Sequence, residues 1–219
     1  MSTAQVNRRS KGEKTRLKIL HAAIEIIAEY GIKGTTHRAV AAKANTQLSL
    51  TTYYFKDIKE LVREAITLSS DIILNSTQDE WHQVFTLLKS FDAVTLRKIS
   101  VKEAICKELS QIAADHMYRN IINNRTTLAV EQVFFTEMLY SEELKDLAKE
   151  HINALLIPFT RFASFFNKVD PEIDGELMLI AITRLQYKYL GTPKDEVNSE
   201  ELHKLIKRQI SWIMGLKRQ

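Results

Sequence analysis

From Leu61 to the end of the chain, apolar residues recur at the three- and four-residue intervals that are typical of α-helices. Few residues interrupt this pattern, because the 219-residue chain contains only three prolines and six glycines. An all-β protein needs many more turn residues between its short strands. The sequence therefore predicts an all-α protein, and its length allows one large domain or a small domain joined to a larger one.

The hydrophobic pattern also predicts where the helices of this region lie. We expect helices over residues 57–75, 78–91, 101–123, 126–140, 142–168, 173–190 and 199–216. The segments DPEIDG and GTPKDEVNS combine proline and glycine with polar residues, as loops do. Pro158 falls within a predicted helix, and we expect it to kink or split that helix because proline cannot donate the helical hydrogen bond.

Three shorter helices are predicted ahead of this region. The first ends at Gly31, where a left-handed residue is tolerated, and Thr36 is a suitable N-cap for the second, HRAVAAKA. A four-residue turn, ANTQ, then leads into a third helix, which completes a helix-turn-helix unit. Residues 1–13 lack apolar periodicity and are predicted to be a disordered basic tail. We therefore expect a helix-turn-helix domain over 14–60 and a larger helical domain over 61–219.

Positive charge is concentrated near the N-terminus. Residues 1–60 carry 11 Lys or Arg and 5 Asp or Glu, whereas the remaining residues carry 20 and 22. A basic segment on a near-neutral body is typical of a head that binds a polyanion, although a solvated surface would have the same composition.

The segment TTYYFKDIKEL places hydroxyl groups and aromatic rings directly before two lysines. The third helix of a helix-turn-helix unit lies in the major groove of DNA, so its exposed face must offer groups to base edges and phosphates. Four consecutive hydroxyl groups are suited to phosphate oxygens, those of Thr51, Thr52, Tyr53 and Tyr54. Phe55 is expected in the core. Lys56 and Lys59 lie at the start of the fourth helix, where free N–H groups favour an anion.

Residues 15–61 resemble the DNA-binding domain of the tetracycline-repressor (TetR) family of bacterial transcription regulators. The matching elements are, in order, YGIKGTT, RAVAAKA, the aromatic run that ends in YYFK, and KEL. The resemblance implies that Arg38 contacts a base edge, where an arginine suits guanine, and that Thr36 and His37 lie near phosphates. The DNA-binding residues expected in all are Thr36, His37, Arg38, Gln47, Leu48, Ser49, Thr51, Thr52, Tyr53, Tyr54, Lys56 and Lys59.

Three positions depart from the family pattern. Asn45 stands where the family usually has a glycine in the turn, and asparagine is the next most tolerant residue for a positive φ. Gln47 replaces the usual serine and is a weaker N-cap for the third helix. Ile58 stands where many members have a phosphate-binding lysine, so Lys56 or Lys59 would have to supply that contact.

The last two predicted helices carry more apolar surface than one subunit needs. In GELMLIAITRLQYKYLG, apolar residues occupy nearly the whole circumference, and such a helix must be covered on both sides. The family resemblance implies a four-helix bundle with a second subunit; full burial within a monomer is the alternative. The expected interface residues are Leu177, Met178, Ala181, Ile182, Leu185, Tyr189, Leu205, Ile206, Ile210, Trp212 and Ile213.

The middle of the chain is rich in aromatic residues and methionine. The resemblance implies an inducer pocket in this region, and such a lining suits an apolar or amphipathic small molecule; an ordinary core is the alternative for each residue. The expected pocket residues are Trp81, Phe85, His116, Met117, Phe134, Phe135, Met138 and Phe159.

The sequence contains no motif that is typical of an enzyme active site or a metal site. It has no Gly-rich phosphate loop, G-x-S-x-G or H-E-x-x-H motif, so no catalytic residue is expected. The histidines lack the spacing of a metal site, and no metal or cofactor is expected. Two rivals remain, which are a helical protein-interaction module with a basic head and an enzyme without a recognisable motif.

The sequence also indicates where the protein acts. No apolar run reaches the roughly 18 residues of a membrane span, and the basic N-terminus lacks the apolar segment of a secretory signal. Cys106 is the single cysteine, and it is either a small buried residue or a redox sensor. The basic tail either reaches along DNA or adds only non-specific charge. A bacterial cytoplasmic protein is expected, associated with the nucleoid when it is bound to DNA.

Together these features and the family resemblance imply a homodimeric, ligand-responsive regulator that binds specific double-stranded DNA. The resemblance implies a repressor that a small apolar or amphipathic molecule releases from a palindromic operator. A transcriptional activator of the same fold is the alternative.

Overall fold

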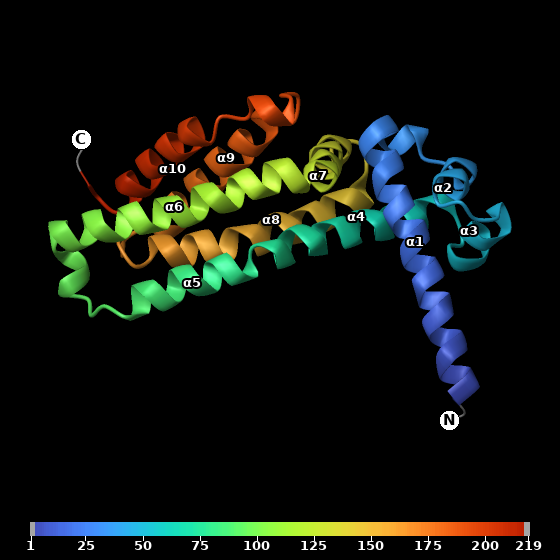
Figure 1. Ribbon diagram of the computed structural model, residues 1–219, viewed down its shortest axis with the longest axis horizontal. Coiled ribbons are helices and arrows are strands. Elements are labelled where there is room, and N and C mark those ends of the chain that lie inside the picture. The colour runs from blue at the N-terminus through green and yellow to red at the C-terminus, as the bar shows by residue number, and fades with distance from the viewer. Residues whose placement is uncertain (1–2, 217–219) are drawn as a thin grey trace. The chain divides into compact units, whose positions relative to one another are not determined.

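The structure is a computed structural model that describes residues 3–216, with the backbone alone for residues 3–10. All regular elements in this range are helices (Figure 1). They are α1 (Thr3–Gly34), α2 (His37–Lys43), α3 (Leu48–Tyr54), α4 (Ile58–Ser76), α5 (Gln78–Lys89), α6 (Ile99–Asn123), α7 (Arg125–Glu137), α8 (Glu142–Ala163), α9 (Pro171–Lys188) and α10 (Ser199–Ile213), with 3-10 turns η1 (Thr95–Arg97) and η2 (Lys194–Glu196). The predicted all-α class is confirmed.

The helices predicted beyond residue 57 all occur, with ends within five residues of the predicted ones. Pro158 does not split its helix: α8 runs without interruption from Glu142 to Ala163. Proline removes one helical hydrogen bond, the one to the Ala154 carbonyl. The neighbouring residues Phe162 and Ala163 are fully packed in the core, and this packing holds the helix across the missing bond.

The N-terminal end of α1 differs from the prediction. Residues 3–13 have a helical backbone instead of forming a disordered tail, and residues 1–2 lie outside the described range. Most of these residues are good helix formers, such as Gln, Arg, Lys and Glu. At the other end, Gly31 has a φ of 69° and interrupts the helix as predicted, because glycine carries no Cβ that would clash.

The chain divides into two compact units, and the boundary differs from the predicted one at residue 60. The N-terminal unit comprises the residues up to Ile72 together with Ala129–Ala148, and the C-terminal unit comprises Ile73–Leu128 and the residues from Lys149 onward. The difference arises because the first half of α4 completes the N-terminal core through Leu61 and Ile66. Two residues of α7 also belong to that core, Val130 and Phe134.

The C-terminal unit has a core of its own. Its buried residues come from α5, α6, α8, α9 and α10, and α10 lies along α6 in Figure 1. The contact between these two helices is apolar, with Leu109 on α6 and Leu202 and Ile206 on α10 almost completely buried. Arg125 fixes the end of α9 through hydrogen bonds from its guanidinium to the Tyr189 and Leu190 carbonyls, at 2.7 and 2.6 Å.

Candidate nucleic-acid interface and small-molecule groove

The loop between α1 and α2 is fixed by two threonines. Thr35 is buried, and its hydroxyl donates to the Gly31 carbonyl at 2.9 Å. Thr36 is the N-cap of α2, as predicted, and its hydroxyl oxygen accepts the Ala39 N–H at 3.1 Å. Gly34 is required because a Cβ there would lie 2.6 Å from the Cβ of Tyr30. The side chains and glycines of the segment YGIKGTT therefore fix the conformation of the loop that leads into α2.

The turn between α2 and α3 has the geometry expected from its sequence. Asn45 has a φ of 45°, which confirms the predicted positive value. The turn is closed by the Thr46 N–H, which donates to the Ala41 carbonyl at 3.0 Å. Gln47 is the N-cap of α3 and makes no hydrogen bond through its side chain to the helix, as expected for a weak cap.

The inner face of α3 packs on the N-terminal core. Phe55 is completely buried, as predicted. Thr51 is also completely buried, and its hydroxyl donates to the Leu48 carbonyl at 2.8 Å. Its predicted role in DNA contact is therefore wrong. The physical reason is that Thr51 lies one helical turn before Phe55 and shares its face.

The outer face of α3 presents the other predicted residues to solvent. Gln47, Leu48, Ser49, Thr52 and Tyr53 are all exposed, with 78% of Tyr53 accessible. They follow one another around the side of α3 opposite Phe55, and Figure 1 places α3 beside α2 at one end of the N-terminal unit. Hydroxyl, amide, aromatic and apolar groups therefore lie together on a single exposed face of α3.

Tyr54 differs from its neighbour. It is half-buried and packs against the N-terminal core, and its ring meets the Tyr53 ring edge-on, with centroids 5.1 Å apart. Its hydroxyl lies 3.4 Å from the point that a Cβ on Gly12 would occupy. Tyr54 therefore packs between α3 and α1, and its ring contacts the ring of Tyr53.

The basic residues of the N-terminal unit fall into two groups. Lys43 and Arg16 are engaged within the protein. The ammonium of Lys43 lies 3.0 and 2.9 Å from the carboxylates of Glu25 and Glu29, and hydrogen bonds to both raise the pKa of Lys43 to about 12. Arg16 pairs with Glu64 and also lies 5.3 Å from the centre of the Phe55 ring.

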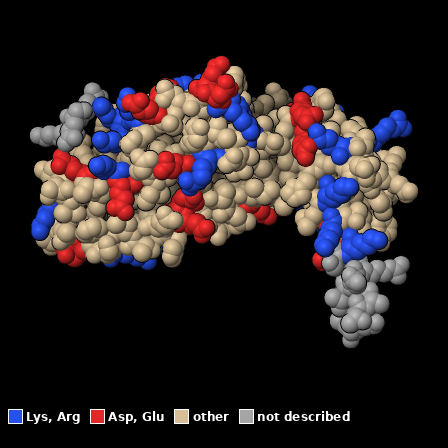
Figure 2. Space-filling view, in the orientation of Figure 1, with Lys and Arg blue, Asp and Glu red and all other residues tan. Residues whose placement is uncertain are grey.

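The second group of basic residues projects into solvent. Arg38 is exposed in the first turn of α2, beside His37, which is half-buried. Lys56 and Lys59 are exposed where α4 begins. Figure 2 shows blue Lys and Arg side chains along the visible side of α1 and near α2 and α3. The cations around α3 are therefore available to an anionic partner.

The N-terminus of α4 already holds an anion. The Asp57 carboxylate accepts the Glu60 N–H at 2.9 Å, and the Glu60 carboxylate accepts the Lys56 N–H. Hydrogen bonds from the backbone of Glu60 keep the pKa of Asp57 below its usual value. The Glu60 N–H is therefore engaged within the protein, and the exposed side chains of Lys56 and Lys59 remain available to phosphate.

The C-terminal unit contains a groove with a volume of about 450 Å³. Two predicted pocket residues, Trp81 and Phe85, line it with stacked rings whose centroids are 5.5 Å apart. A third, Phe159, packs edge-on against Trp81 at 5.0 Å. The full lining is Leu74, Thr77, Gln78, Trp81, His82, Phe85, Thr86, Lys89, Ala154, Pro158 and Arg161.

The other predicted pocket residues lie elsewhere. Met117 is buried in the C-terminal core. Phe134 is buried in the N-terminal core, where Phe135 and Met138 pack against it. Phe134 and Phe135 lie on α7 and Met138 directly follows it, and this segment belongs to the N-terminal unit instead.

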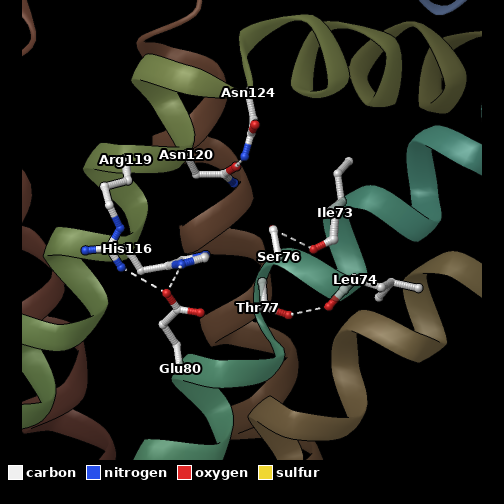
Figure 3. A network of polar contacts seen from close by, with 9 residues as sticks. All are labelled: Ile73, Leu74, Ser76, Thr77, Glu80, His116, Arg119, Asn120 and Asn124. Atoms are coloured by element: carbon white, nitrogen blue, oxygen red, sulfur yellow. Dashed lines mark hydrogen bonds and ion pairs between the residues drawn. The ribbon is translucent and has the colours of Figure 1, made fainter. Parts of the chain in front are cut away.

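His116 takes part in a polar link between α5 and α6. Its Nδ1 lies 3.0 Å from the Glu80 carboxylate, and the Arg119 guanidinium donates to the same oxygen at 2.9 Å (Figure 3). Burial alone would raise the pKa of Glu80, but the hydrogen bonds from His116 and Arg119 outweigh it and keep that pKa below its usual value. His116 is thus a structural partner of Glu80 rather than a residue of the groove lining.

The sequence did not reveal several residues of the groove. Arg161 and Pro158 lie three positions apart on α8 and therefore share a face, next to the predicted Phe159. That spacing in the segment LLIPFTRF was the available signal. Lys89 and His82 had no comparable signal, because a polar residue on α5 is equally compatible with a solvated face.

The residues predicted for the subunit interface differ in how much of their surface is accessible. Leu177, Leu205 and Trp212 are exposed, with 57% of Leu177 and 54% of Trp212 accessible. Half-buried positions are Ala181, Ile182, Leu185 and Ile213. The remaining four are buried in the C-terminal core and cannot face a partner, so their prediction was wrong: Met178, Tyr189, Ile206 and Ile210.

Two further apolar residues of α9 lie on the same exposed surface. Ile173 and Ile180 are exposed, and with Leu177 they form a stripe at intervals of four and three residues. The Gln209 side chain donates to the Leu177 carbonyl at 3.3 Å, which joins this stripe to α10. We call these exposed residues, Ile173, Leu177, Ile180, Leu205 and Trp212, the α9–α10 stripe.

Three further observations concern metal sites, membrane-spanning helices and Cys106. Within residues 3–216, no three His, Cys, Asp or Glu side chains gather as a metal site would require. None of the described helices has the length and hydrophobicity of a bilayer-spanning segment. Cys106 is buried, and burial raises the pKa of its thiol.

Comparison with known proteins links this architecture to regulators. Residues 19–65 match the profile of "Bacterial regulatory proteins, tetR family". No curated protein sequence matches the chain significantly. A transcriptional regulator from Rhodococcus sp. Rha1 has a similar fold, with a TM-score of 0.66 and 15% identity over 91% of this chain and 96% of that one.

Two further solved structures have the same fold. A TetR-like transcriptional regulator from Rhodococcus sp. RHA1 is 14% identical, with a TM-score of 0.61 over 93% of this chain and 97% of that one. The multidrug binding protein EbrR, solved with ethidium, is 20% identical, with a TM-score of 0.59 over 89% and 97%. Residues 19–65 therefore carry the helix-turn-helix domain of the tetR family, as predicted, and the chain as a whole has the fold of these transcriptional regulators.

Proposed function

We infer that the protein is a homodimeric repressor that binds a palindromic operator and is released from it by a small apolar or amphipathic molecule. The observation that carries this proposal is the outer face of α3. Its exposed side chains form a surface that can enter the major groove, while Thr51 and Phe55 hold the helix on the core. Tyr53 leaves 78% of its surface accessible to a partner.

Each residue of the interface has a chemical role in this proposal. Arg38 presents a guanidinium fork that can bind the two acceptors of a guanine edge. Ser49 and Thr52 can donate to base edges or phosphates, and Leu48 can contact a thymine methyl. Tyr53, Lys56 and Lys59 hold the phosphate backbone, as Gln47, Thr36 and His37 do at the ends of α2 and α3.

The α9–α10 stripe supports a symmetric dimer. Exposed apolar side chains at helical spacing cost free energy in water and are covered when two copies meet. A two-fold dimer uses the same surface on both subunits and doubles the recognition helix. A palindromic operator is the DNA counterpart of that symmetry.

The groove of the C-terminal unit is the proposed effector site. Helix α4 begins in the N-terminal unit, where Leu61 is buried in the core, and ends beside Leu74 of the groove lining. A ligand that prefers one position of this helix would shift the spacing of the two recognition helices. Operator DNA must then weaken ligand binding by the same factor as the ligand weakens DNA binding.

Selection from random duplex DNA tests the proposal. We expect the purified protein to enrich one palindromic sequence, and we expect Arg38→Ala to weaken binding about 10- to 100-fold, with relaxed preference at one base pair of each half-site. Enrichment of no sequence over random DNA would contradict the proposal. Transcription from a promoter that carries the selected site then distinguishes repression from activation.

A further inference from the structure

The groove of the C-terminal unit has an aromatic wall and a cationic edge. Trp81 and Phe85 stack nearly parallel, with an angle of 17° between their planes. Only 7% of Phe85 is accessible and its ring is covered by Arg161 and Phe165, so the partly exposed Trp81 offers the apolar surface. The groove volume of about 450 Å³ lies within the usual range for small-molecule sites, about 300–1,000 Å³. A flat wall of this kind favours a planar ring that stacks on it.

Arg161 gives the groove its charge. Its guanidinium lies 3.9 Å from the centre of the Phe85 ring, so the side chain is stacked in place with its N–H groups at the edge of the aromatic wall. Within residues 3–216, no carboxylate pairs with this guanidinium. An arginine that is already stacked loses little further freedom when it binds an anion.

The rest of the lining has the same sign. Lys89 and His82 also line the groove, and none of its described lining residues is Asp or Glu. A cationic ligand would therefore lose water there without gaining a counter-charge, whereas an anion would gain two or three donors. Opposite α5, the small side chain of Ala154 and the ring of Pro158 leave the wall apolar.

We propose that this groove binds planar aromatic carboxylates, with the ring against Trp81 and the carboxylate on Arg161. The proposal rests on the proposed function only in taking the groove as the effector site. It sets this chain apart from its structural neighbour EbrR, which was solved with ethidium, a planar cation. The charge of the groove thus selects the class of ligand.

Three probes of the same shape and different charge test the proposal, namely 2-naphthoate, 2-naphthamide and 2-naphthylmethylammonium. Calorimetric titration of the full chain, without DNA, is expected to show 2-naphthoate binding about tenfold or more tightly than either of the others. Equal or tighter binding of the cation would overturn the proposal, as would the absence of binding by 2-naphthoate.

Variants locate the effect at Arg161. Arg161→Gln is expected to weaken 2-naphthoate binding about tenfold or more and to leave 2-naphthamide binding nearly unchanged. Lys149→Gln removes an exposed cation from the same helix and should change neither. If Arg161→Gln binds 2-naphthoate as well as the unaltered protein does, the carboxylate is not held there and the proposal is wrong.

A measurement on the unaltered protein covers the case in which Arg161→Gln does not fold. The chain contains two tryptophans, Trp81 and Trp212, whose indole N–H signals can be separated by NMR with a Trp212→Phe reference. Addition of 2-naphthoate is expected to shift the Trp81 signal and not the Trp212 signal. An unmoved Trp81 signal at saturating probe would contradict the proposal.

The outcomes keep this inference apart from the proposed function. Binding of 2-naphthoate at Trp81 without any effect on DNA affinity would support the groove chemistry and contradict the proposed effector role. Enrichment of a palindrome together with no binding of 2-naphthoate would support the DNA-binding function and overturn the ligand class.

Discussion

Adjacent residues of α3 have opposite surroundings, and this contrast makes the recognition surface testable. Tyr53 points into solvent, whereas Tyr54 packs between the N-terminal core and Gly12. Thr52 and Thr51 form a second pair of the same kind, one exposed and one buried. The sequence places two like residues side by side, and only their position around the helix separates a recognition role from a packing role.

Replacing each tyrosine by alanine separates the two roles. Tyr53→Ala should leave the free energy of unfolding within about 0.5 kcal/mol of the original value and should weaken operator binding. Tyr54→Ala should lower the free energy of unfolding by about 2 kcal/mol, because it removes a ring that is packed on the core. Urea unfolding and DNA titration check both, and a large stability loss in Tyr53→Ala would show that its ring is packed.

At this scale the sequence predicted most of the site through backbone chemistry. The N-cap at Thr36 and the positive φ at Asn45 follow from side-chain hydrogen bonding and steric freedom. The error at Thr51 arose because its hydroxyl was taken as a sign of exposure. Its bond to the Leu48 carbonyl satisfies that hydroxyl within the helix, so burial costs little.

The helices of the C-terminal unit depend on close contacts between neighbouring elements. Gly175 of α9 lies against the backbone of Thr160 on α8, and a Cβ at Gly175 would be 2.8 Å from the Thr160 N and Cα. Any side chain larger than the hydrogen atom of glycine therefore cannot fit at position 175 unless α8 or α9 moves. This contact requires glycine for space rather than for backbone conformation.

Gly175→Ala is expected to lower the free energy of unfolding by about 1–3 kcal/mol, the usual cost of overpacking. Gly191 offers a matched control in the same unit, since a Cβ there would meet nothing within 4 Å. Gly191→Ala should leave stability unchanged or slightly raised. Thermal or urea unfolding distinguishes them, and equal effects at both positions would contradict the close approach of α8 and α9.

The polar link between α5 and α6, in which the Glu80 carboxylate accepts from His116 and Arg119, makes the stability of the C-terminal unit depend on pH. The pKa of Glu80 is lowered in the folded protein, so its carboxylate stabilises the fold above the ordinary glutamate pKa, and this contribution disappears as the pH falls through the lowered value. Glu80→Gln should therefore lose stability at pH 7 and much less at the acidic end. Asp79→Asn, on the same turn of α5, is the control, and a loss that is equal at both pH values would rule out this link.

Helix positions were predictable because an amphipathic helix repeats its apolar residues every three or four positions over many turns. The membership of helices in the two units was not, since α7 carries apolar residues that would suit either core. Its place is decided by the N-terminal core, in which Val130 and Phe134 are buried in the same cluster as Leu61 and Ile66. The side chains of Phe135 and Met138 were therefore predicted in the wrong unit.

For the whole molecule, the proposed function requires two copies. The α9–α10 stripe is the surface that a second copy would cover, and it includes Leu177, with 57% of its surface accessible in the single chain. A charge placed there would be buried without a partner in the dimer, which costs several kcal/mol per interface.

Leu177→Glu is therefore expected to shift the protein from dimer to monomer in sedimentation velocity and to weaken operator binding strongly. Val169→Glu alters an exposed apolar residue outside the stripe, with 91% of Val169 accessible, and should remain dimeric. If Leu177→Glu stays dimeric, the stripe is not the interface.

Hydroxyl-radical footprinting of the selected DNA site measures the central claim most directly, since it reports where each recognition helix lies on the duplex. The account predicts two equal protected half-sites, related by a two-fold axis and centred about one helical turn or a multiple of it apart, and loss of both with Tyr53→Ala. A single unsymmetric patch, or uniform protection that ignores sequence and the α3 substitution, would contradict the claim that α3 reads DNA from a symmetric pair of subunits.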